Sequence, residues 1–107
     1  VGKWDTARVR SMRASFMVAS SFNQDVEEWT TGMVDCMYAT FQSADSFNQQ
    51  VGKWNTAQVL SMQKLFLRAA KFDQVVSTWN TANVLTQSHL FSKATRFNQE
   101  TGQWNTA

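Results

Sequence analysis

Apolar side chains recur along this chain at a fixed step, so that the chain divides into units of equal length. Tryptophan marks the step most clearly, at Trp4, Trp29, Trp54, Trp79 and Trp104. Two sets of phenylalanines and one set of valines keep the same step, namely Phe16, Phe41, Phe66 and Phe91, then Phe22, Phe47, Phe72 and Phe97, then Val9, Val34, Val59 and Val84. A fixed period of about 20–50 residues is typical of proteins in which each unit stacks only on its neighbours. The pattern therefore predicts stacked units with a shared aromatic interior.

The first part of each unit carries a helical pattern. The apolar spacing i, i+3, i+7 and i+10 is that of an amphipathic helix, and the third unit carries it at Val59, Met62, Phe66 and Ala69. A threonine precedes the stripe at the position of an N-cap, as Thr56 does here. We therefore expect helices over 7–20, 32–45, 57–70 and 82–95.

The second part of each unit has an extended pattern. Phe47, Gln49 and Val51 alternate with other side chains at a period of two, which places them on one side of a strand. The pattern predicts short strands over 22–26, 47–51, 72–76 and 97–101, although Asn and Gln are poor strand formers.

Together these elements predict an α/β fold, a right-handed solenoid of four helix-strand repeats with parallel strands. One repeat domain spans 1–107, with units 4–28, 29–53, 54–78 and 79–103 and a partial unit 104–107. Strands pack about 4.8 Å apart and helices about 8–10 Å apart, so the strand side should be concave, as in a leucine-rich repeat. Neither end shows a polar capping unit, so we expect a segment of a longer array, or ends covered by neighbouring subunits.

The motif W-[ND]-T-A-x-V-x-x-M-x-x-x-F-x-x-A-x-x-F-[ND]-Q resembles the BspA-type surface-protein repeat. The third unit carries it at Trp54, Asn55, Thr56, Val59, Met62, Phe66, Ala69, Phe72 and Gln74. This resemblance implies a leucine-rich-repeat-like solenoid, generally at the cell surface, that serves adhesion or protein binding.

The composition and charge of the chain exclude some classes of binding partner. The net charge of +2 and the pI near 9.0 are too mild to indicate nucleic acid, which usually requires clustered Lys and Arg on one face. Cys36 is the one cysteine, so no disulfide can form within the chain, and it stands where the other units have Ser11, Ser61 and Thr86. No apolar run is long enough to span a membrane, so we expect no direct membrane insertion.

A polar position follows the second phenylalanine of each unit, and its members are Asn23, Asn48, Asp73 and Asn98. Stacked amides of this kind can form a ladder that satisfies backbone polar groups at a corner. A metal site is the alternative, but one carboxylate among three amides suits Ca²⁺ badly. We expect a structural ladder, and neither a metal nor a cofactor.

The recurrent positions, such as the tryptophans and phenylalanines, form a frame that stays constant from unit to unit. Positions that differ between units on this frame are candidates for binding. They form three groups after the expected strand onset, namely Asp25, Gln50, Val75 and Glu100, then Glu27, Gly52, Ser77 and Gly102, then Glu28, Lys53, Thr78 and Gln103. From these groups we select eight partner-binding candidates, Asp25, Glu27, Glu28, Gln50, Lys53, Thr78, Glu100 and Gln103. A broad polar surface of this kind suits a protein or glycan better than a small buried ligand. The alternative is that these positions are simply unconstrained solvent positions.

The chain lacks the constellations that catalysis requires. His89 has no cysteine or serine nucleophile motif nearby, and the adjacent Glu27 and Glu28 point apart on an extended segment. We therefore expect a non-enzymatic protein- or glycan-binding module of an adhesion-type surface protein. The alternative is a structural scaffold or linker subunit packed within a larger intracellular or organellar assembly.

Overall fold

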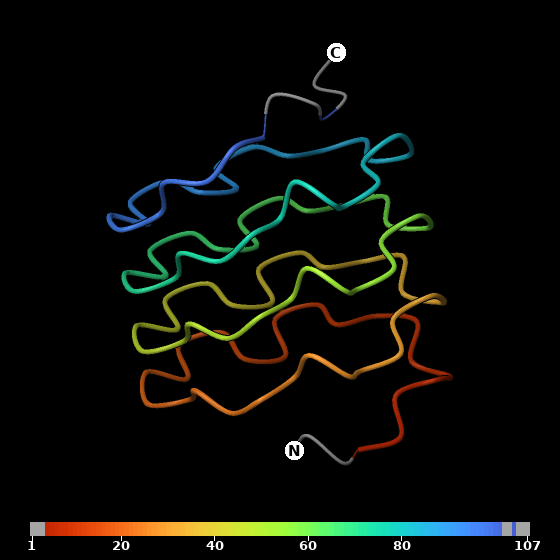
Figure 1. Ribbon diagram of the computed structural model, residues 1–107, viewed down its shortest axis with the longest axis horizontal. Helices are drawn as coiled ribbons and strands as arrows, with labels where there is room; N and C mark the ends of the chain where they lie inside the picture. Colours follow the sequence, from red (N-terminus) through yellow and green to blue (C-terminus); the bar gives the residue numbers. More distant parts are fainter. Residues whose placement is uncertain (1–3, 102–103, 105–107) are drawn as a thin grey trace.

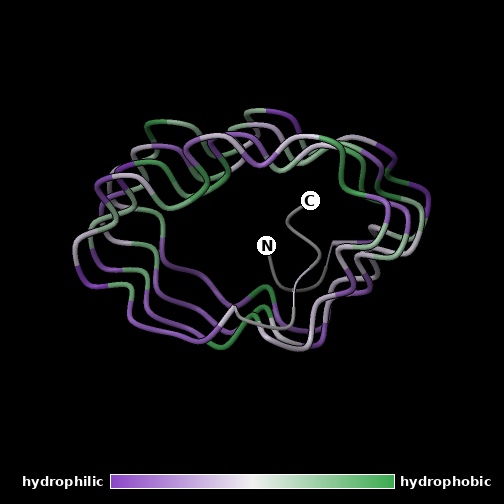
Figure 2. Cartoon of the chain, turned by 90° about the horizontal axis from the view of Figure 1, so that it is seen from above, coloured by the Kyte–Doolittle hydropathy of each residue, from purple (hydrophilic) through white to green (hydrophobic). Residues whose placement is uncertain are grey.

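Equivalent residues of successive units lie above one another in the computed structural model, which describes residues 4–101 and Trp104. Isolated parallel β-bridges join Ser11 to Cys36, Cys36 to Ser61, and Ser61 to Thr86. The chain thus passes the same point four times. Figure 1 shows these turns as a stack from red to blue, and Figure 2 shows from above that each turn is an elongated ring. We call the turns coils one to four, with the ranges 4–28, 29–53, 54–78 and 79–101.

The α/β prediction is wrong. The described part of the chain contains no helix and no strand beyond the three single-residue bridges. The expected right-handed, leucine-rich-repeat-like solenoid of helix-strand repeats is therefore not formed. The chain is instead a compact body of 33 × 31 × 19 Å, built from turns that hydrogen-bond from coil to coil.

The expected helices are absent because every second backbone N–H leaves its own segment. In coil three the N–H groups of Met62, Lys64, Phe66 and Arg68 donate to carbonyls of coil four, at 2.9–3.0 Å. The N–H groups between them, such as those of Leu65 and Leu67, donate three residues back within the coil. An α-helix needs each N–H to bond four residues back, so this alternation excludes it. Coils one and two repeat the same arrangement.

Left-handed backbone conformations are the second reason. Two positions of every coil have φ between 53° and 61°, and they are Ala14, Val18, Ala39, Ser43, Lys64, Arg68, His89 and Lys93. None of them is glycine, the residue that adopts such angles without steric cost. A right-handed helix cannot pass through these positions. They fold the wavy side of each ring into consecutive tight turns (Figure 1).

The expected strands are absent because side chains occupy the backbone groups that a sheet would pair. The N–H of Asn48 donates to the Oδ1 of Asn23 at 2.9 Å, and Gln49 Nε2 donates to the Asn23 carbonyl at 3.0 Å. The same two contacts recur at Asp73 and Asn98. A backbone-to-backbone ladder therefore does not form along this side, and the concave strand surface is also wrong.

Three columns of aromatic rings fill the interior. The columns are Trp4, Trp29, Trp54, Trp79 and Trp104, then Phe16, Phe41, Phe66 and Phe91, then Phe22, Phe47, Phe72 and Phe97. Successive rings lie 5.5–6.3 Å apart in all three columns. The predicted curvature required helices, about 8–10 Å apart, on one side of the stack and strands, about 4.8 Å apart, on the other. The described residues form no helix, and the three ring columns have similar spacings, so this reason for curvature is absent. The predicted shared aromatic interior is confirmed, because Phe66 and Phe72 are fully buried and Trp54 is 3% exposed.

Polar side chains complete the interior by bonding from coil to coil. The indole N–H of Trp54 donates to the carbonyl of Val26 at 2.9 Å, and Trp79 donates to Val51 at 2.8 Å. The buried Thr56 has no helix to cap, and its hydroxyl donates to the Asn80 carbonyl at 3.0 Å. Among the described residues, no buried side-chain nitrogen or oxygen lacks a hydrogen-bond partner. The core therefore contains no uncompensated polar group.

The ring columns predict how truncation of one tryptophan affects stability. Trp54 has a stacked indole on each side and a buried N–H bond. Trp54→Ala should lower the free energy of unfolding by about 3–5 kcal/mol, through the cavity it leaves. Trp4 is 58% exposed and, among the described residues, stacks on Trp29 alone, so Trp4→Ala should cost under about 2 kcal/mol. Urea unfolding of both variants tests this, and equal losses would contradict it.

The left-handed positions predict a stabilising substitution. Val18 has φ 61° although it is β-branched, and its side chain is 63% exposed. Val18→Gly should raise the free energy of unfolding by about 0.5–1 kcal/mol, since the relief of αL strain exceeds the entropy cost of glycine. Val75 is also exposed but does not have a positive φ, so Val75→Gly should destabilise. Thermal and urea unfolding of the pair measure the difference. A loss of stability in Val18→Gly would contradict this account.

Candidate interaction surface

The variable positions lie in columns on the outside of the stack. Asp25, Gln50, Val75 and Glu100 form one column, and each is exposed. Glu28, Lys53 and Thr78 form the next column and are also exposed, whereas Glu27 between the two is half-buried. Gln103 and Gly102 lie outside the described residues. Of the eight candidates, the structure thus places seven on neighbouring columns of one side of the coils.

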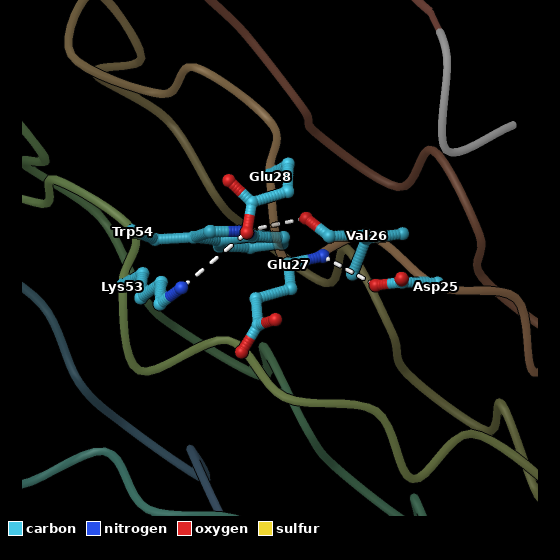
Figure 3. A network of polar contacts seen from close by, with 6 residues as sticks. All are labelled: Asp25, Val26, Glu27, Glu28, Lys53 and Trp54. Atoms are coloured by element: carbon cyan, nitrogen blue, oxygen red, sulfur yellow. Dashed lines mark hydrogen bonds and ion pairs between the residues drawn. The ribbon is translucent and has the colours of Figure 1, made fainter.

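The best-defined contact on this surface joins coils one and two (Figure 3). Lys53 Nζ lies 3.4 Å from Glu28 Oε1, and both side chains are about two-thirds or more exposed. The Asp25 carboxylate accepts the N–H of Glu27 at 2.9 Å, a local turn that holds this corner. An exposed ion pair of this kind contributes about 0–1 kcal/mol, so the fold does not depend on it.

A shallow depression lies along the first column in coils two and three. Gln50, Gly52, Gln74 and Val75 line it, and its volume is about 190 Å³. A Cβ at Gly52 would come within 3.2 Å of the Val75 carbonyl, so a larger residue would force a shift here. Thr78 donates its hydroxyl to the Gly52 carbonyl at 2.7 Å. Typical small-molecule pockets have about 300–1,000 Å³, so this depression suits part of a larger partner.

The polar column beside these residues is continuous. The Oδ1 of Asn23, Asn48 and Asp73 each accepts the backbone N–H of the equivalent residue one coil further on, at 2.9–3.0 Å. The same Oδ1 atoms also accept Nε2 of a glutamine of that coil, at 2.9–3.0 Å. Each of these three side chains therefore uses one oxygen to satisfy two donors.

This geometry explains why Asp73 fits where other coils have asparagine. Only the Oδ1 acceptor is used, and a carboxylate supplies it as well as an amide does. The side-chain bond from Gln99 and the backbone bond from Asn98 both favour the ionised form, so they lower the pKa of Asp73 below its ordinary value.

Neither a metal-ligand cluster nor a membrane-spanning helix is found in the part of the chain that the structure describes. No group of three or more His, Cys, Asp or Glu among these residues is placed to hold a metal ion. In the same part of the chain, no helix has the length and apolar character that crossing a membrane requires. His89 is exposed, and Cys36 is half-buried, with backbone bridges to Ser11 on one side and to Ser61 on the other.

Sequence reasoning missed a second feature, a groove of about 530 Å³ on coils two to four. Its basic side chains are Lys64, Arg68, His89 and Lys93. They occupy equivalent positions of the third and fourth units in pairs, so aligning the units would have placed Lys64 beside His89 and Arg68 beside Lys93. The net charge of the whole chain does not reveal this group of basic residues, because it also counts the acidic residues of the other coils.

The lowered pKa of Asp73 predicts a pH dependence. Its folded pKa lies below the unfolded value of about 3.9, so its ionised form stabilises the fold above about pH 4. This contribution is lost as the pH falls through the folded pKa. Asp73→Asn keeps the Oδ1 acceptor and removes the titration, so its free energy of unfolding should fall less between pH 6 and pH 2.5. Urea unfolding at both pH values measures this. Asp45→Asn, outside the ladder, is the control, and an equal effect in both variants would contradict the prediction.

Comparison with known proteins returns one family and no individual relative. A search of curated proteins and a search of solved structures each found no match. The family model described as "Mycoplasma protein of unknown function, DUF285" matches residues 1–59 and again residues 31–107. The two matches together span the whole chain and overlap by a little more than one coil. The chain therefore belongs to the DUF285 family.

Proposed function

We propose that this chain is a non-enzymatic module that binds a protein or glycan partner through its two exposed columns. The observation that carries the proposal is that one backbone frame presents different chemistry at equivalent positions. One column runs from Asp25 through Gln50 and Val75 to Glu100, so it changes from acidic to neutral to apolar and back. Frame positions such as Trp54 and Phe66 keep their identity instead.

The exposed columns contribute little to folding. The Glu28–Lys53 pair is exposed to solvent, and the backbone hydrogen bonds from coil to coil form without it. Side chains that stability does not require are free to be matched to a partner. The depression of about 190 Å³ along the first column favours contact over a broad area rather than capture of a small molecule. The similarity to BspA-type repeats supports a place at the cell surface and a role in adhesion.

The scaffold hypothesis has one observation of its own. Trp4 is 58% exposed, and Val9, Phe16 and Phe22 of coil one are only partly buried. A hollow of about 300 Å³ with a mostly apolar lining lies over this outer face of coil one. An apolar face of this kind suits contact with another apolar surface, as in a larger assembly.

A charge swap tests the main proposal. In Glu28→Lys/Lys53→Glu the ion pair and the net charge are kept, but the polarity of the surface is reversed. Probes are an array of defined glycans and a set of purified surface-exposed proteins. Any probe bound by the wild type should bind the swap variant about tenfold or more weakly, because like charges then face each other. Affinity is measured by biolayer interferometry, with urea unfolding as the folding control.

Gln50→Arg places bulk at the depression and should weaken binding of the same probe. Arg8→Gln, on an exposed position away from the columns, is the matched control and should leave binding unchanged. Binding that survives both column variants would contradict the proposal. Binding that is lost in Trp4→Lys and unaffected by the charge swap would favour the scaffold role.

A further inference from the structure

The basic groove is built from two positions of the repeated turn. Lys64 and His89 occupy one position in coils three and four, and Arg68 and Lys93 occupy the other. The N–H of Lys64 donates to the carbonyl of Ser88, and the N–H of Arg68 donates to that of Ser92. These bonds bring each basic residue of coil three beside its counterpart in coil four.

The positive charge of the groove is not balanced nearby. The groove lining contains no acidic residue. In the described part of the chain, the one ion pair within 4 Å joins Glu28 and Lys53, in other coils. Coils three and four, taken as residues 54–103, carry five Lys and Arg against two Asp and Glu, whereas residues 4–53 carry four against six. The groove therefore lies in the positively charged half of the molecule.

This arrangement has a cost that the fold itself does not recover. Arg68 and Lys93 are like charges one coil apart, and they repel each other. Arg68, His89 and Lys93 are exposed, so core packing does not compensate. The equivalent positions of coil one are Ala14 and Val18, so the turn does not require charge. Positive charges of one sign, kept together at exposed positions where the turn does not require them, point to an anionic ligand.

The lining favours one class of anion. Ser43, Ser92 and Gln42 add hydroxyl and amide groups beside the cations, which suit sugar hydroxyls. Single-stranded nucleic acid is usually held by bases stacked on aromatic rings, and no Trp, Tyr or Phe lines the groove. The groove is open and its charges span two coils, so it suits an extended chain rather than a single phosphate.

We propose that this groove binds a linear sulfated polysaccharide. Sulfate groups of the chain lie against the exposed Arg68 and Lys93, while its hydroxyls bond the serine and glutamine side chains. The ammonium of Lys64 lies 5.9 Å from the centroid of the Tyr38 ring and adds to the positive potential of the groove. The site is separate from the columns that begin at Asp25 and Glu28, so either can fail without the other.

Isothermal titration calorimetry with a heparin oligosaccharide tests the proposal. The wild type should bind, and binding should weaken as NaCl is raised from 50 to 200 mM, because salt screens exposed charges. The variant Arg68→Gln/Lys93→Gln should bind about tenfold more weakly, at roughly threefold for each exposed charge removed. Both side chains are exposed, so the fold should be kept, as urea unfolding can verify.

The matched control is Arg8→Gln/Arg10→Gln, which removes the same charge from exposed positions of coil one. It should change the affinity less than about twofold, because these two charges lie outside the groove and salt screens their attraction at a distance. Equal weakening in both double variants would show attraction by net charge alone and overturn the site. Three further probes are desulfated heparin, poly-glutamate and single-stranded DNA. Tighter binding of any of these than of heparin would overturn the assignment to a sulfated polysaccharide.

Discussion

The structure depends on parallel stacking of equivalent aromatic rings in successive coils. Rings of the tryptophan column lie 5.9–6.3 Å apart, with interplanar angles of 3–11°. These separations fall within the range that aromatic pairs prefer. Because each ring needs its counterpart one unit away, the constant length of the units is itself a structural requirement. An isolated coil would leave both faces of its rings in water, so stability must arise between coils rather than within them.

The sequence indicated which residues stack and which are buried, but not the backbone that carries them. Val59, Met62, Phe66 and Ala69 have helical spacing and are all buried, so the period was informative about the interior. The same spacing is also produced by successive turns that bond three residues back, and periodicity cannot separate the two. The decisive signal would be the left-handed φ of Lys64 and Arg68, yet neither is a residue type that indicates it.

The candidate sites could be predicted to the extent that they follow the register. Asn23, Asn48 and Asp73 occupy the same position of successive units, and this alone places them in one column. Their partners could not be predicted, because the acceptance of a neighbour's N–H by Oδ1 depends on the backbone path. The basic groove was missed for another reason. Lys64 and Lys93 belong to different units of the sequence, and only the folded register makes them neighbours.

Some positions of each coil are restricted by hydrogen bonds and packing between coils, whereas others are free to vary at the surface. Positions such as Asn48 must accept two donors, and Trp54 must fill its column, so the frame limits both to a few residue types. Lys53 and Arg68 satisfy no such demand, although each stands one or two residues from a frame position. A substitution at these outer positions changes the surface charge while the stack beneath it stays the same. Recognition can therefore differ from coil to coil on a constant scaffold, and it is at these positions that a functional role is to be sought.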